Sequence, residues 1–102
     1  MTREEAIAVL RDHAPELKAA GVLSASLFGS TARGEAGPGD VDVAVRLAEN
    51  FSAGGFDYFH QLDLLEQRLS KLLGSKVDVV AEPIRRKRPL QDEIDRDRAL
   101  AF

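Results

Sequence analysis

Alternating apolar and polar side chains predict three short strands along the chain. The first spans Val22 to Phe28 and places Leu23, Ala25 and Leu27 on one face. Successive side chains of a strand point to opposite faces of a sheet, so we expect these three residues to face the core. The third predicted strand spans Val77 to Ala81 and ends before a proline.

The second predicted strand, Asp40 to Leu47, is the clearest because its two faces differ in chemistry. Val41, Val43 and Val45 share one face, and the opposite face begins with two aspartates. A face made only of valine indicates burial. We therefore expect this strand to be central in its sheet.

Apolar residues three and four positions apart predict the helices. The longest helix spans Phe56 to Leu73 and includes Phe59 in its apolar stripe. An N-terminal helix begins after Thr2, and a last helical segment runs from Ile84 with a break at Pro89. The order of these elements predicts an α/β (α+β) domain with a small mixed sheet.

Composition narrows the class of protein. The 102 residues, 44% hydrophobic and 30% charged, are typical of one globular domain, and we expect residues 1–102 to form it. The absence of cysteine excludes disulfides, thiolate metal sites and a cysteine nucleophile. The N-terminus lacks a signal-peptide pattern and no apolar run is long enough to span a membrane, so we expect a cytoplasmic protein without a membrane partner.

Charge gives a weaker indication of partners. The net charge of −3 does not favour direct binding to nucleic acid. Residues Arg85 to Arg88 nevertheless form a concentrated basic run. The run fits a solvated helix face, or a contact with a polyphosphate, an RNA or an acidic partner, and the sequence leaves these readings open.

Gly29-Ser30 follows the first predicted strand and is a candidate phosphate-binding turn. Glycine allows a phosphate to approach the backbone closely, and the Ser30 hydroxyl can donate a hydrogen bond to its oxygens. A Gly-Ser pair after a strand is more often a simple turn. Its significance here rests on the carboxylates that follow at Asp40 and Asp42.

Three aspartates on predicted strands are the candidate metal ligands. Asp40 and Asp42 are two positions apart on one strand, so their side chains point the same way. Asp78 lies on the third predicted strand and joins them if the two strands are neighbours. Carboxylate oxygens suit Mg²⁺, which is usually completed by substrate phosphates. The alternative reading for each aspartate is a solvated residue on an edge strand.

The run LFGSTARGE at residues 27–35, the run GDVDVAV at residues 39–45 and the run KVDVV at residues 76–80 resemble the minimal nucleotidyltransferase family of the polymerase-β-like superfamily. Each motif alone is weak, but the combination is specific and spans almost the whole chain. The resemblance implies a nucleotidyltransferase fold, with a small mixed sheet and helices packed mainly on one face. Gly39 departs from the family, in which serine is common at this position.

The resemblance also implies roles for individual residues. Gly29 and Ser30 would hold the phosphates of ATP, and Arg33 would approach them or pair with an acid of its own loop. Asp40 and Asp42 would bind Mg²⁺. Asp78 would complete the metal site or accept a proton.

The function implied by the family is transfer of AMP from ATP to a protein hydroxyl, a tyrosine. The protein would be the antitoxin of a pair with a HEPN-domain toxin, and the two would form a hetero-oligomer. Two alternatives remain open from the sequence. One is an antitoxin that inhibits its partner by occlusion without catalysis, and the other is nucleotidyl transfer to a small molecule or an RNA end.

Overall fold

A computed structural model describes residues 1–35, 40–52, 58–85 and 87–102. Residues 36–39, which include Gly39, lie outside these ranges, as do Phe56 of the predicted long helix and Arg86 of the basic run. The elements follow one another in the order α1 Arg3–Asp12, α2 Ala14–Ala19, β1 Val22–Phe28, α3 Gly29–Ala32, β2 Val41–Leu47, a 3₁₀ helix Glu49–Ser52, α4 Tyr58–Leu73, β3 Val77–Glu82, α5 Arg88–Asp97 and β4 Ala99–Leu100. None of the described helices is long and apolar enough to cross a membrane.

One mixed sheet organises the molecule, with its strands in the order β3-β2-β1-β4. Strand β1 pairs antiparallel with both β2 and β4, whereas β2 and β3 run parallel. The predicted central position of the valine-faced strand is confirmed, because β2 has a neighbour on each side. The predicted mixed α/β fold is likewise confirmed.

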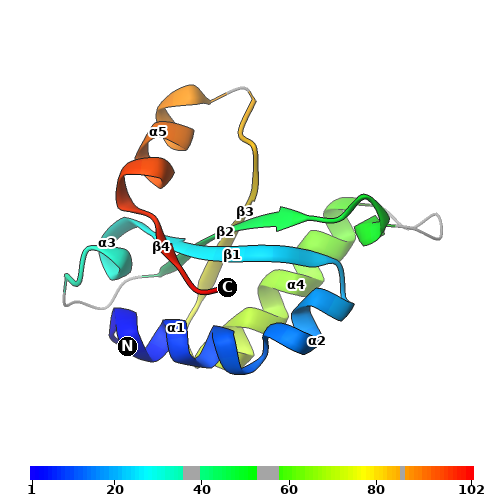
Figure 1. The fold of residues 1–102 in the computed structure, drawn as a ribbon, viewed down its shortest axis with the longest axis horizontal. Coiled ribbons are helices and arrows are strands. Elements are labelled where there is room, and N and C mark those ends of the chain that lie inside the picture. The colour runs from blue at the N-terminus through cyan, green and yellow to red at the C-terminus, as the bar shows by residue number, and fades with distance from the viewer. Residues whose placement is uncertain (36–39, 53–57, 86) are drawn as a thin grey trace.

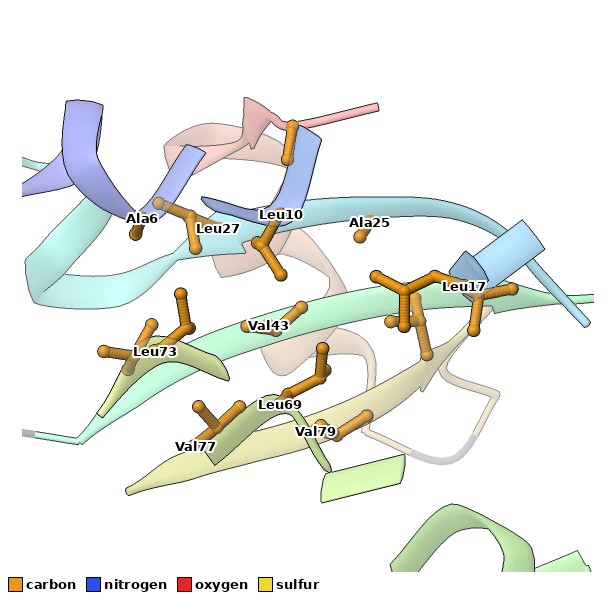
Figure 2. Packing of buried hydrophobic residues seen from close by; sticks show 14 of the residues in the cluster. Ala6, Leu10, Leu17, Ala25, Leu27, Val43, Leu69, Leu73, Val77 and Val79 are labelled. Atoms are coloured by element: carbon orange, nitrogen blue, oxygen red, sulfur yellow. The ribbon is translucent and has the colours of Figure 1, made fainter. Parts of the chain in front are cut away.

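The main core fills the space between the sheet and helices α1, α2 and α4, which cover one face (Figure 1). Leu10 of α1, Val43 of β2 and Leu69 of α4 point into this space (Figure 2) and are at most 1% exposed. Full burial of such a side chain contributes about 1.5–3 kcal/mol. The valine face of β2 belongs to this core, as its sequence pattern predicts.

Helix α5 lies alone against the other face of the sheet (Figure 1). Its Ile94 is fully buried and packs with Phe28 of β1 and Ala44 of β2. Because side chains two positions apart share a face, Asp42 belongs to the same face as Ala44. The aspartates of the strands therefore face the α5 side of the sheet, away from the main core.

A buried ion pair joins this face to the end of α5. Arg98 donates hydrogen bonds to both carboxylate oxygens of Glu82, and its Nη1 lies 3.1 Å from the Ser26 hydroxyl. The Glu82 side chain is 1% exposed. Hydrogen bonds from Arg98 hold the pKa of Glu82 below its usual range, against the opposing effect of burial. The pair therefore fixes α5 and β4 to the sheet as charged groups.

In two of the predicted elements, a side chain that the pattern assigns to the apolar face is exposed in the structure. Leu23 is 59% exposed, because the β1–β2 pairing shifts register between Val22 and Ser24 and turns Leu23 out of the core. Phe59 is 73% exposed at the start of α4, where the predicted stripe is buried only from Leu62 onward.

The predicted last helical segment is wrong in its start and in its break. It begins at Arg88 instead of Ile84, and Pro89 lies in its first turn and does not break it. A proline is tolerated there because the first N–H groups of a helix have no intrahelical partner. The helix ends at Asp97, and Leu100 belongs to the short strand β4 and is 58% exposed.

Candidate active site

Gly29 and Asp42 meet at the point where β1 ends. Phe28 of β1 pairs with Asp42 of β2, and Gly29 then turns into α3 with a φ of +73°. A Cβ at Gly29 would lie 2.5 Å from Oδ2 of Asp42, closer than real Cβ contacts allow. The turn is therefore packed directly on the carboxylate, and only glycine leaves room for it.

Asp42 and Asp78 are brought together by the parallel pairing of β2 and β3. The register places Asp42 opposite Asp78, and Val41 opposite Val77. Asp78 shares its face of β3 with Val80, which packs on the same cluster as Ala44. Both side chains therefore point to the α5 side of the sheet, and both are half-buried.

Asp40 immediately precedes β2 and completes a group of three neighbouring carboxylates. Its side chain is 45% exposed, and its Oδ2 lies 3.7 Å from Nζ of Lys76. The structure thus brings Asp40, Asp42 and Asp78 to one edge of the site. Asp40 differs from the other two in having Lys76 as an ion-pair partner.

The carboxylates favour each other's protonated forms. Burial raises the pKa of Asp42 above its ordinary value, and the charges of Asp78 and Asp40 raise it further. Burial also raises the pKa of Asp78. A side-chain hydrogen bond with Asp40 and the charge of Asp40 raise the pKa of Asp78 further. Like charges held close together in this way are relieved by a cation.

The donor set of this site fits a hard divalent cation. Carboxylate oxygens are the ligands that Mg²⁺ prefers, and it takes its remaining ligands from water and phosphates. Within the described ranges, no three acidic, histidine or cysteine side chains are arranged to hold a metal ion by themselves. The carboxylates therefore fit Mg²⁺ by their chemistry and their proximity, and a substrate would supply the remaining ligands.

Ser30 and Arg33 follow Gly29 on the short helix α3. Ser30 is half-buried, and Arg33 caps the end of the helix. The Arg33 guanidinium lies 2.6 Å from Glu35 through Nε and 2.7 Å from Asp97 through Nη1. Of the two roles predicted for Arg33, the structure contains the pairing with a loop acid. The positive charge of Arg33 also opposes the rise in the pKa of Asp42, so the guanidinium lies near the carboxylates.

Two acidic residues of α5 border the site and were not predicted from the sequence. The Asp97 side chain is 5% exposed and pairs with Arg33, and the charge of Glu93 contributes to the raised pKa of Asp42. A signal for both exists in the sequence. Glu93 and Asp97 are four residues apart and flank Ile94, so that both lie on the side of α5 that faces the sheet.

Comparison with known proteins identifies similar domains. The family model described as a nucleotidyltransferase domain matches residues 10–101. A solved structure described as that of a minimal nucleotidyltransferase is 29% identical, with a TM-score of 0.69 over 97% of this chain and 95% of that chain. No curated protein matches the chain.

Two solved toxin–antitoxin structures share the fold. One, with AMP-PNP, is 24% identical, with a TM-score of 0.61 over 100% of this chain and 73% of that chain. The other is a tri-AMPylated Shewanella oneidensis HEPN toxin in complex with an MNT antitoxin. It is 24% identical, with a TM-score of 0.57 over 98% of this chain and 68% of that chain. The resemblance predicted from the motifs is confirmed by the family model and by the minimal nucleotidyltransferase.

Proposed function

The chain belongs to the nucleotidyltransferase domain family, and from this premise we propose that it transfers AMP from ATP to a hydroxyl of a partner protein. The observation that carries the proposal is the pairing of Asp42 with Asp78 beside Gly29. These residues place carboxylates against a glycine, which has no side chain of its own. A nucleotide phosphate and a divalent cation would occupy such a site together.

In this proposal Gly29 and Ser30 contact the phosphates, and the aspartates form the site for Mg²⁺. Gly29 lets the phosphate approach the backbone, and the Ser30 hydroxyl donates a hydrogen bond to a phosphate oxygen. Asp40 and Asp42 supply metal ligands, and Asp78 either adds a third or accepts a proton. The metal, when bound, neutralises charge on the phosphates and on the entering and leaving oxygens.

The reaction is an in-line displacement at the α-phosphorus of ATP. The acceptor hydroxyl oxygen forms a bond to that phosphorus, and the bond to the bridging oxygen of the β-phosphate breaks. AMP is thereby joined to the acceptor, and pyrophosphate leaves. The hydroxyl proton passes to a carboxylate, and in this proposal Asp78 accepts it when it is not a metal ligand.

The acceptor is a tyrosine of a HEPN-domain toxin, and the two proteins form a hetero-oligomer. The support is a shared fold with toxin–antitoxin structures, one of which contains a tri-AMPylated HEPN toxin.

Intact-mass spectrometry of the toxin tests the proposal. A HEPN-domain protein encoded next to this chain would be incubated with it, ATP and Mg²⁺. We expect mass increments of one or more AMP units with the unaltered chain. We expect none with Asp40→Ala/Asp42→Ala, and full increments with Asp12→Ala/Asp63→Ala, which removes the same charge from exposed positions.

A different outcome would point to the alternative function. If the complex forms and the toxin is inhibited while its mass does not change, transfer to this partner is excluded. The chain would then act by occlusion. Neutralisation that survives the Asp40→Ala/Asp42→Ala substitution would support the same conclusion.

A further inference from the structure

An apolar groove runs beside β3, outside the candidate active site. It has a volume of about 570 Å³ and lies between β3, the start of α4 and the segment that leads into α5. Leu62, Val79 and Ile84 contribute apolar side chains from these three parts of the chain. Tyr58 and Phe59 stand at its α4 end and are 37% and 73% exposed. Exposed aromatic side chains beside an apolar groove are typical of interaction sites.

The rim of the groove is basic. Arg85 and Lys87 line it, both are exposed, and Arg88 follows at the first position of α5. None of these three makes an ion pair with another described residue. Arg33 and Arg98, in contrast, are each paired with two carboxylates. In a chain of net charge −3, unpaired cations around an apolar groove complement an acidic partner.

Part of the edge of β3 is already occupied by hydrogen bonds to α4, up to the residue where the groove begins. The backbone N–H of Val77 donates to the Ser70 hydroxyl at 3.0 Å, and that of Val79 donates to Glu66 Oε2 at 3.0 Å. Both acceptors belong to α4. Strand addition requires free N–H groups along the edge. The groove therefore suits a helix, which binds through side chains and needs no backbone hydrogen bonds from β3.

The groove and the candidate active site share one strand. Asp78 faces the site, and the two residues that follow it, Val79 and Val80, line the groove. The lining of the groove begins one residue after Asp78 along β3, so a segment bound there would lie next to the site along this strand. The neighbouring part of the same partner could then reach the nucleotide.

We propose that this groove docks an amphipathic helix of the acceptor protein. The apolar face of the helix fills the groove, and its flanking carboxylates pair with Arg85 and Lys87. The proposal rests on the proposed function for the identity of the partner. It assigns acceptor recognition to a surface distinct from the residues that perform the transfer.

The test is the affinity of the purified HEPN-domain partner for two double variants of the chain. Arg85→Glu/Lys87→Glu reverses the rim, and Lys18→Glu/Lys71→Glu makes the same change of net charge at exposed positions away from the groove. We expect the rim variant to bind at least about tenfold more weakly, and the control variant to bind within about twofold of the unaltered chain. Phe59→Ser should also weaken binding, because it removes apolar area from the groove.

The possible outcomes separate this proposal from the proposed function. Equal affinities for the rim variant and the control would overturn the proposal that the groove docks the partner. Groove-dependent binding without any AMP on the partner would support docking and overturn the transfer reaction. No binding by the unaltered chain would overturn both the groove and the choice of partner.

Discussion

At the scale of single residues, Gly29 constrains the site most strongly. Its φ of +73° is unfavourable for any side chain, and a Cβ would meet Asp42 Oδ2 at 2.5 Å. We expect Gly29→Ala to reduce AMP transfer about 100-fold, because it displaces the carboxylate from its position. Steady-state transfer assays on the purified variant measure this loss.

Gly34→Ala is the matched control for the residue-scale prediction. Gly34 has nearly the same φ, +75°, but nothing lies within 4 Å of a Cβ there. Both substitutions share a backbone penalty of about 1 kcal/mol, which urea denaturation measures. If the two variants lose transfer activity equally, the contact between Gly29 and Asp42 has no part in the site.

We expect Asp42 to lower the stability of the folded protein and to be required for transfer. Its pKa is raised in the folded protein, chiefly by burial, so the ionised form is less favourable there than in the unfolded chain. This unfavourable contribution is absent below the ordinary value of 3.8 and is complete above the raised folded value. Asp42→Asn should therefore raise Tm at pH 7 and less so at pH 3.5, while transfer falls about 100-fold or more.

The control for Asp42 is Asp63→Asn on the exposed surface of α4. We expect no dependence of its Tm difference on pH, and unchanged transfer. A lower Tm for Asp42→Asn at pH 7 would contradict the inferred repulsion among the carboxylates. Calorimetry at the two pH values decides between the outcomes.

At the scale of elements, Arg98 joins α5 and β4 to the sheet. Arg98→Ala would leave the Glu82 carboxylate, 1% exposed, without its cation. Loss of one partner of a buried pair costs about 3 kcal/mol or more, so we expect a large fall in the free energy of unfolding. Arg96→Ala, which removes an arginine that is 71% exposed, should change it by less than about 1 kcal/mol.

The same pair predicts how stability depends on pH. The folded pKa of Glu82 is lowered, so its contribution is present above the ordinary value of 4.5 and is lost as the pH falls through the folded value. In Glu82→Gln, the free energy of unfolding should not show this loss as the pH falls. Identical pH profiles for the variant and the unaltered chain would show that the pair is not charged in the folded protein.

The sequence predicts elements well where one pattern persists over several turns or residues. The valine face of β2 and the leucine spacing of α4 are such cases, and their burial follows from periodicity alone. The exposure of Leu23 follows instead from an irregularity in strand pairing, and β4 exists only because β1 offers it an edge. Both depend on tertiary contacts between distant segments.

The site likewise combines features that the sequence pattern predicts with features that depend on tertiary contacts. Asp42 and Asp78 are recognisable as strand aspartates, but their proximity depends on the parallel pairing of β2 with β3. The ion pair between Arg33 and Asp97 joins residues that are 64 positions apart and has no local signal. Periodicity therefore finds the carboxylates, and only the fold shows what surrounds them.

At the scale of the whole molecule, binding of nucleotide should stabilise the fold. ATP with Mg²⁺ at about a hundred times its Kd adds about 2.7 kcal/mol to the free energy of unfolding if only the folded chain binds it. We expect a corresponding rise in Tm that disappears on chelation of Mg²⁺ with EDTA. Asp40→Ala/Asp42→Ala should show no rise, and an equal rise in that variant would exclude the aspartates from the metal site.

The site forms only in the native register of β2 against β3, so nucleotide binding reports whether a molecule has folded correctly. A slip of one residue between these strands would turn Asp78 toward the main core and bring a valine to the site in its place. A slipped chain could retain its helices and most of its sheet and yet bind no nucleotide. The fraction of a preparation that binds ATP would then count the molecules with native register, which spectroscopic measures of secondary structure do not distinguish.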